Sequence, residues 1–293
     1  MAEIAIGLDE ALIRKALSGA SGGITGRVLA QGDGWTISDL ICTCGPHDRS
    51  LEERHTDFHI AIVMAGSFQY RSAVGRELMT AGSLLLVNAD HDFECSHDHG
   101  SGDRCLSFSY TPEHFARVAA DAGVKCGRPE FSVVRLPALR ALSSFVAQAR
   151  AGLANVSVSW EELSLQMAGQ AVRLARGMPE SGGAGGTALG QVTRCVRMIE
   201  RHPESNLSLA RLAQHAGLSP FHFLRTFKRL TGVTPHQYVR RMRIREAATL
   251  LLREKAQVLD IALDCGFGDV SNFNHAFRAE FGVSPLRYRR RFR

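Results

Sequence analysis

Long apolar runs are absent from this chain of 293 residues. No stretch approaches the roughly 18 consecutive apolar residues that a membrane-spanning helix requires. The N-terminal stretch MAEIAIGLDEALIRKAL mixes acidic and basic residues with apolar ones, so it lacks the uninterrupted apolar region of a signal peptide. We therefore expect a cytoplasmic protein with no membrane partner.

A paired cysteine framework is also absent. The sequence has seven cysteines, an odd number, and they are scattered through both halves. Disulfide-stabilised secreted domains carry an even number of cysteines at regular spacings. Reduced thiols in a cytoplasmic protein are therefore the expected state.

Acidic residues are scarce in only one part of the chain. Residues 187–293 contain 19 Lys and Arg against 8 Asp and Glu, a net charge of +11, whereas residues 1–186 contain 16 against 21 and carry −5. This asymmetry predicts a basic module that binds a polyanion, joined to an acidic module with another task. A basic face that is merely solvated is the alternative.

The organisation that is present is that of two globular domains. Apolar residues make up 45% of the chain and charged residues 22%, an ordinary globular composition, and the length predicts two domains. The Gly-rich segment 177–190 predicts a flexible linker between them. Before it, apolar spacing predicts helices at about 137–150 and 159–176, the second opened by a capping box of Ser159 and Glu162. We expect residues 137–176 to form dimerisation helices.

Short β-forming runs occupy residues from about 24 to 110. WTISDLI, HIAIVMAG, SFQYRS, SLLLVN and CLSFSY are separated by Gly, Asp and Asn turns, which is typical of a small β-sandwich or barrel. The predicted fold class is α+β with two domains. A β-barrel domain spans residues 1–136 and is followed by helices, and an all-α domain spans residues 191–293.

The all-α domain contains an internal repeat. LAQHAGLSPFHFLRTFKRLTGVTPHQY (212–238) aligns with IALDCGFGDVSNFNHAFRAEFGVSPLRY (261–288) at an offset of 49, which becomes 50 after one inserted residue. Glycine ends a short helix in each copy, at Gly217 and Gly266, because glycine adopts the left-handed conformation most easily. The repeat predicts two helix-turn-helix units, joined by a helix from about Pro235 to Arg253.

The second helix of each unit separates aromatic from polar side chains. Phe223 and Phe227 lie one helical turn apart and predict a buried stripe, as do Phe273 and Phe277 in the second unit. The polar side chains on the outer faces suit hydrogen bonding to base edges, and an α-helix fits the major groove of DNA. A polar face that merely meets water is the alternative.

The repeated units, the connecting helix and the ending GVSPLRYRR closely resemble the DNA-binding domain of the AraC/XylS family of bacterial transcription regulators. The resemblance covers about residues 190–291 and places the helix-turn-helix units at about 208–231 and 257–281. It implies that two recognition helices enter successive major grooves of promoter DNA. The base-reading candidates that it implies are Phe221, Leu224, Arg225, Ser271, Asn272, Asn274 and His275, and the predicted DNA-binding set also includes His222, Lys228, Arg229 and Arg278.

The N-terminal half resembles, more loosely, the cupin-like effector-sensing domain of the same family. That resemblance implies a small-molecule effector in the barrel. We expect an apolar pocket lined by Ile60, Ile62, Met64, Leu84 and Leu86.

A metal site is a separate hypothesis. The segment CSHDHGSGDRC brings together Cys95, His97, His99 and Cys105, side chains that bind Zn²⁺ or a soft transition metal. A polar turn without metal is the alternative, and no cofactor is firmly expected. Cupin enzymes hold a metal with a His-x-His and Glu group and a later His, whereas here His55 and His59 are spaced differently and Phe93 stands near the position of the later His.

Together these features predict a sequence-specific transcription regulator that is not an enzyme. Its expected partners are promoter DNA, RNA polymerase, an unknown small-molecule effector and a second copy of the chain, and it is nucleoid-associated in the bacterial cytoplasm when bound to DNA. A cupin-type metalloenzyme fused to a DNA-binding domain is the first alternative. An architectural protein that binds DNA without sequence preference is the second.

Overall fold

The computed structural model describes residues 3–124, 129–154, 157–178, 186–253 and 255–291. The chain divides into two compact units. We call the first the sheet unit, which comprises Gly7–Pro137 and Ser159–Gly190. The second is the helical unit, which comprises Ala138–Val158 and Gln191–Arg293 together with Met1–Ile6.

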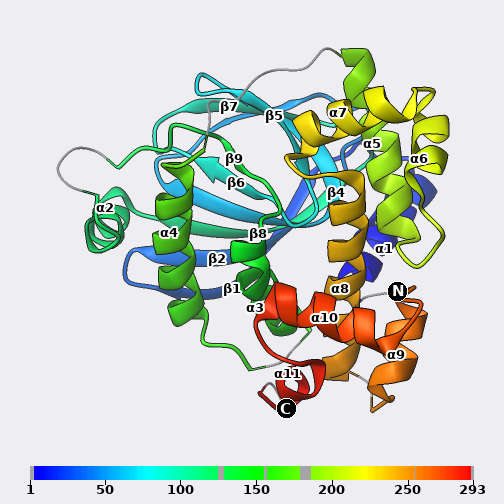
Figure 1. Cartoon of the computed structure of the whole chain (residues 1–293). Helices are drawn as coiled ribbons and strands as arrows, with labels where there is room; N and C mark the ends of the chain where they lie inside the picture. The colour runs from blue at the N-terminus through cyan, green and yellow to red at the C-terminus, as the bar shows by residue number, and fades with distance from the viewer. Residues whose placement is uncertain (1–2, 125–128, 155–156, 179–185, 254, 292–293) are drawn as a thin grey trace. The chain divides into compact units, whose positions relative to one another are not determined.

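The sheet unit is built on antiparallel strands in the order β1-β2-β8-β4-β6-β9, with β5 and β7 also paired to β4 and β3 paired to β7 (Figure 1). The strands are β1 (Ile24–Gly32), β2 (Trp35–Cys42), β3 (Leu51–Arg54), β4 (Phe58–Ser72), β5 (Arg76–Thr80), β6 (Leu84–Val87), β7 (Asp92–Ser96), β8 (Asp103–Tyr110) and β9 (Arg135–Leu136). This arrangement agrees with the predicted barrel-like domain.

The long strand β4 makes the sheet close on itself. Its first half pairs with β6 and β8, and its second half pairs with β5 and β7. A register shift between Val63 and Ala65 marks the change of direction, as bulges commonly do. Gly66 follows with φ 75°, and a Cβ there would lie 2.4 Å from the Gly102 carbonyl oxygen. Only glycine fits this crossing.

Helices accompany the sheet. They are α1 (Glu3–Ser18), which belongs to this unit from Gly7 on, α2 (Pro112–Asp121) and α4 (Trp160–Ala175). Helix α4 begins where the sequence predicts, because the Ser159 hydroxyl accepts a hydrogen bond from the Glu162 backbone N–H at 3.4 Å. The buried Tyr110 hydroxyl donates to the Ser164 carbonyl at 2.9 Å and fixes α4 to the end of β8.

The helical unit contains the predicted repeat. Its elements are the short 3₁₀ helix η1 (Arg140–Leu142), α3 (Ser143–Leu153), α5 (Gly186–Arg201), α6 (Leu209–Ala216), α7 (Pro220–Thr231), α8 (Pro235–Arg253), α9 (Val258–Asp264), α10 (Val270–Phe281) and α11 (Pro285–Arg291). The predicted connecting helix from Pro235 to Arg253 is therefore present with the same bounds.

The core of the helical unit uses one aromatic arrangement twice. Phe223 and Phe227 have ring centroids 5.5 Å apart, and Phe273 and Phe277 have them 5.6 Å apart. The second ring of each pair meets a tyrosine edge-on, Tyr238 at 5.7 Å and Tyr288 at 5.4 Å, a favourable aromatic geometry. The four phenylalanines are 0% exposed. Their predicted core role is confirmed.

The two units divide the predicted dimerisation segment, residues 137–176. Helix α3 belongs to the helical unit and α4 to the sheet unit. Of the predicted linker, residues 177–190, residues 179–185 lie outside the described part of the chain, and Gly186 already begins α5. Among the described residues, no helix is long and apolar enough to cross a membrane.

Candidate nucleic-acid interface and ligand cavity

The first helix-turn-helix unit is set by short-range hydrogen bonds. The Ser208 hydroxyl accepts from the Arg211 N–H and begins α6. Gly217 ends that helix with φ 68°, and the next residue returns a hydrogen bond from its N–H to the Ala213 carbonyl at 3.0 Å. Ser219 then caps α7 by accepting from the His222 N–H, as Ser before Pro favours. The turn therefore fixes where α7 starts and which face it presents.

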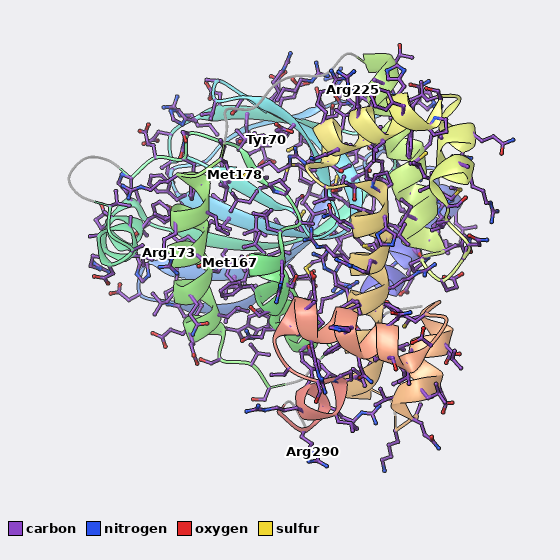
Figure 2. All side chains as sticks on the ribbon, viewed as in Figure 1. Tyr70, Met167, Arg173, Met178, Arg225 and Arg290 are labelled. Atoms are coloured by element: carbon purple, nitrogen blue, oxygen red, sulfur yellow. The ribbon has the colours of Figure 1, made fainter. Side chains whose placement is uncertain are left out.

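The outer face of α7 carries the predicted DNA-binding residues. Phe221 is 70% exposed, and the Arg225 guanidinium lies 5.8 Å from the centre of its ring, within the range of a cation–π contact. Arg225 is exposed on α7, where Figure 2 labels it, and the contact joins it to a ring one helical turn earlier. The remaining members of the set on α7 are His222, Lys228 and Arg229, which are exposed, and Leu224, which is half-buried.

The second unit begins its reading helix differently. The Asp269 carboxylate caps α10 by accepting from the Asn272 backbone N–H at 2.7 Å, and it also accepts from the Asn272 side-chain amide at 2.5 Å. Asn272 is therefore held at the cap, which restrains it from reaching a base. The other predicted residues on α10 are Ser271, His275 and Arg278, which are exposed, and Asn274, which is half-buried.

A buried acid on the inner side of α10 was missed by the sequence reasoning. Glu280 is 9% exposed. Its carboxylate accepts a hydrogen bond from the buried Ser143 hydroxyl of α3 and lies 3.4 Å from the Arg241 Nε of α8. Burial lowers the pKa of Arg241, and Glu280 opposes that shift. The signal in the sequence was the one acid of this helix, at a position equivalent to the buried Leu230 of the first unit.

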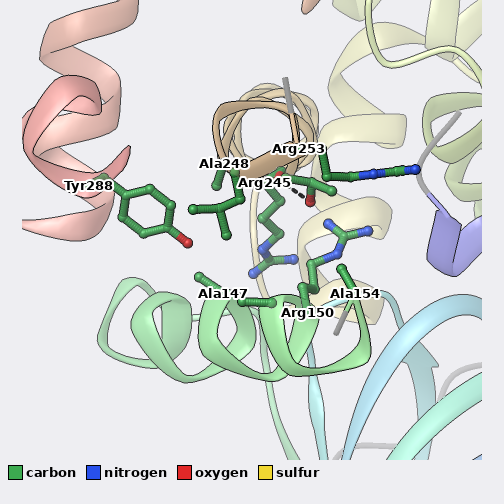
Figure 3. A pocket seen from close by; sticks show the side chains of 10 residues that line it. Ala147, Arg150, Ala154, Arg245, Ala248, Arg253 and Tyr288 are labelled. Carbon is green, nitrogen blue, oxygen red and sulfur yellow. Dashed lines mark hydrogen bonds between the residues drawn. The ribbon is translucent and has the colours of Figure 1, made fainter. Parts of the chain in front are cut away.

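Helix α3 is thereby part of the second unit's packing. Ala147 of α3 joins the apolar cluster that contains Ile244, Phe273 and Phe277. Beside it, Arg150 and Arg245 lie between α3 and α8, with Tyr288 close by (Figure 3). Burial lowers the pKa of Arg245 to about 10. The space between them is about 10 Å³, hardly enough for one water molecule, so α3 is closely packed.

The sheet unit encloses a cavity of about 340 Å³, a size typical of small-molecule sites. His55 and His59 line it with ring centroids 4.3 Å apart. Burial, and then the neighbouring His55, lower the pKa of His59 to about 3. The wall also includes Thr36, Ser38, Ala61, Leu85, Val87 and Phe93. The cavity is therefore mostly apolar with a few polar groups.

The residues predicted to line an effector pocket are not those that line this cavity. Ile60, Ile62, Met64, Leu84 and Leu86 are buried but do not line the cavity. Side chains alternate along a strand, so His59 and Ala61 point into the cavity while Ile60 and Ile62 point to the opposite face. Ile60 pairs with Phe108 on that face, two residues before the Tyr110 that bonds α4. Ile60 and Ile62 are therefore buried on the face of β4 away from the cavity.

The predicted metal-ligand segment is only partly brought together. Cys95, His97 and Cys105 line the cavity, whereas His99 is exposed and does not. Two residues join them that the prediction omitted, Cys42 and Asp103. Cys42 is directly opposite Asp103 in the β2–β8 register, a pairing between residues far apart in sequence that no local pattern shows.

The arrangement expected of a cupin enzyme is not formed by the described residues. Among them, the His/Cys/Asp/Glu groups whose ligand atoms converge within 4.8 Å comprise Cys42, His97 and Asp103 alone. His55 instead packs against Phe93, with ring centroids 5.0 Å apart, and its Nε2 lies 3.3 Å from a Glu53 oxygen. Among the described residues, His55 and His59 therefore have no third donor that converges with them.

Comparison with known proteins gives matches in both halves. A family model described as an AraC-like ligand binding domain matches residues 38–165, and one described as a helix-turn-helix domain matches residues 212–291. The transcriptional activator AarP of Providencia stuartii is 41% identical over 91 residues, 31% of this chain and 67% of AarP. The activator RhaS of Citrobacter koseri is 26% identical over 247 residues, 80% of this chain and 86% of RhaS.

Two further matches cover about a third of this chain. The probable regulator LumQ of Photobacterium leiognathi is 40% identical over 90 residues, 31% of this chain, and the match spans only 36% of LumQ. The DNA-binding domain of AdpA, solved in complex with a target DNA, is 30% identical with a TM-score of 0.34, covering 35% of this chain and 93% of that one.

Proposed function

Because this chain belongs to the AraC family of transcriptional regulators, we propose that it binds promoter DNA through its two helix-turn-helix units. A small molecule in the cavity of the sheet unit controls that binding. The observation that carries this proposal is the pair of reading helices, α7 and α10, which pack on the same aromatic arrangement, each on its own copy, but expose different polar faces. Two different faces suit an asymmetric DNA site.

The exposed side chains suit two kinds of DNA contact. Arg225 has the geometry for bidentate binding to guanine in the major groove, the commonest specific contact of arginine. Lys228, Arg229 and Arg278 suit phosphate contacts, which orient the protein without reading sequence. The charge of +11 on residues 187–293 supports the same partner, since counterion release from DNA drives such binding.

Helix α3 offers a route between ligand and DNA. It follows β9 and precedes α4, both in the sheet unit, yet it packs within the helical unit against α8 and α10. A ligand that binds one conformation of the sheet unit more tightly than another shifts the unit toward that conformation. Because the chain runs from the sheet unit through α3 and back, such a shift would alter how α3 packs on α8 and α10. We place the dimer contact on α4, where Leu165 is 41% exposed, because α3 is already covered.

The protein acts in the bacterial cytoplasm, on the nucleoid, together with RNA polymerase. The metalloenzyme alternative is not favoured, because the family consists of regulators and because His55 and His59 lack a third donor among the described residues. The architectural alternative predicts that affinity is independent of sequence.

Selection from a random duplex library separates these functions. We expect the full chain to enrich one asymmetric site with two elements about one helical turn, roughly 10 bp, apart. Failure to enrich any sequence, with DNA still bound at low salt, would favour the architectural alternative. Immunoprecipitation of the sites occupied in cells would then identify the neighbouring genes and, through them, the chemical class of the effector.

A further inference from the structure

Three chemically different metal-binding side chains meet at one end of the cavity. They are Cys42 at the end of β2, Asp103 at the start of β8 and His97 in the loop after β7. Their ligand atoms lie within 4.8 Å of one another. The residues are only 5%, 6% and 5% exposed, so this is not a chance meeting of surface groups.

The backbone fixes all three positions. Cys42 and Asp103 face each other across the β2–β8 pairing. The Gly102 N–H donates to the Cys44 carbonyl at 2.8 Å, and the Gly100 N–H donates to the His97 carbonyl, which closes the loop between β7 and β8. His97 Nε2 lies 2.8 Å from an Asp103 oxygen. The donors are therefore held before any ligand arrives, which lowers the cost of binding.

A fourth donor, Cys105, lies beside this group, but its sulfur is not within 4.8 Å of all three ligand atoms, so its side chain must turn to join them. The Cys105 thiol donates to the other Asp103 oxygen at 3.2 Å, and Cys105 lines the same cavity as the first three residues. Thiolate, imidazole and carboxylate in a set of four are the ligands that Zn²⁺ and similar borderline or soft cations take in tetrahedral sites. The cavity supplies a path by which a cation enters.

The thiols of the site are available to a cation. A bound cation takes a cysteine as its thiolate, and the thiol proton is displaced. Cys42, Cys95 and Cys105 are free thiols, so these sulfurs are not consumed by a disulfide.

We propose that Cys42, His97, Asp103 and Cys105 form a binding site for one thiophilic divalent cation of the Zn²⁺ or Cd²⁺ class. Binding replaces the His97–Asp103 and Cys105–Asp103 hydrogen bonds by bonds to the metal, and the protons of the two thiols pass to solvent. The site does not depend on DNA binding. A purely hydrogen-bonded cluster, without metal affinity, is the competing explanation of the same contacts.

Metal titration of the reduced full chain tests the site directly. After chelator treatment, we expect Co²⁺ to give a thiolate-to-metal charge-transfer band that saturates at one equivalent and is abolished by Zn²⁺. Cys42→Ser should lower the intensity of the band, to which the Cys105 thiolate still contributes, and His97→Gln and Asp103→Asn should each weaken Co²⁺ binding by at least about tenfold, the least that loss of a ligand's hydrogen-bond partner costs. His99→Gln, in the same loop, and Cys195→Ser, in the helical unit, are matched controls that should bind as the unchanged chain does.

A second measurement needs no substitution, in case a variant fails to fold. Cd²⁺ should protect Cys42 and Cys105 of the unchanged chain from alkylation, as mapped by mass spectrometry, and should leave Cys195 as reactive as before. Either of two results would overturn the proposal. One is that neither Co²⁺ nor Cd²⁺ binds saturably, and the other is that binding persists unchanged in folded His97→Gln and Asp103→Asn.

Discussion

The two helix-turn-helix units have the same aromatic packing but differ at a buried position that, in the second unit, contacts the neighbouring helices α3 and α8. Leu230 of α7 and Glu280 of α10 occupy equivalent positions, and both are nearly buried, at 5% and 9% exposed. The leucine completes an apolar core, whereas the glutamate binds Ser143 of α3 and Arg241 of α8. At this position the repeat has exchanged an apolar core residue for an acid, and the acid gives the second unit a polar contact with α3.

The outer faces differ in the same way. Helix α7 presents Arg225, Lys228 and Arg229, whereas Arg278 is the cation of the predicted set on α10. The first unit therefore suits charge-assisted contacts and the second suits neutral hydrogen bonds. We infer that the first unit supplies most of the DNA affinity and that the second, coupled to α3, is the one that ligand occupancy adjusts.

Truncation of the buried phenylalanines that the two units have in common should have the largest effect on the free energy of unfolding. Phe227→Ala and Phe277→Ala should each destabilise the protein by roughly 3–5 kcal/mol, because each ring is 0% exposed and meets a tyrosine edge-on. Denaturant unfolding measures both. Phe221→Ala, at a ring 70% exposed, should change the unfolding free energy by no more than about 0.5 kcal/mol. Clearly unequal losses for the two buried rings would break the equivalence of the cores.

Substitution of Glu280, the position at which the two units diverge, should lower the free energy of unfolding by a somewhat smaller amount. Glu280→Ala leaves Arg241 without its buried partner, and we expect a loss of about 3 kcal/mol, at the low end for a broken buried ion pair. Ser143→Ala should cost about 1 kcal/mol. The double variant should lose less than the two single losses combined, because one contact is shared. Strict additivity in the same unfolding assay would show that α3 and α10 are not coupled through Glu280.

The helical unit was predictable because short-range capping residues set the ends of its helices. Helix α8 starts at Pro235 as predicted, because Thr before Pro begins a helix, and α6 and α7 end at Gly217 and Gly232 because glycine takes the left-handed conformation there. The buried phenylalanine stripes followed from the helical period alone. The placement of α3 did not follow, because an amphipathic helix shows that it packs but not which surface it packs on.

Strand pairing explains what could not be predicted in the sheet unit. Both faces of β4 around Ile60 and Ile62 are apolar or buried, so alternation could not tell the cavity face from the helix-covered face. Cys42 meets Asp103 only through the register of β2 on β8, which depends on contacts across the whole sheet. The segment from Cys95 to Cys105 supplied His97 and Cys105 but could not supply the partner from β2.

Substitutions on the outer faces of α7 and α10 should differ in how much DNA affinity and base discrimination they cost. Arg225 and His275 occupy equivalent positions and are both exposed. Arg225→Ala should cost about 1–3 kcal/mol on the selected site and abolish discrimination at one base pair. His275→Ala should cost about 0.5–1.5 kcal/mol, the worth of one neutral hydrogen bond. Binding to a set of single-base variants of the site measures both, and equal effects on specific and nonspecific DNA would remove the base-reading role.

The smallest effect concerns phosphate contacts, where the two units should behave alike. Lys228 and Arg278 are equivalent in the repeat and both exposed, so their position relative to the duplex should be the same. Replacing either by Ala should weaken binding to all sequences alike and reduce the slope of log affinity against log salt by about 1. Arg173→Ala, an exposed cation on α4 of the sheet unit, controls for the loss of one charge and should leave the slope unchanged. If Lys228→Ala changes the slope and Arg278→Ala does not, the second reading helix does not lie in a groove as the first does, and the proposed contact of two successive grooves fails.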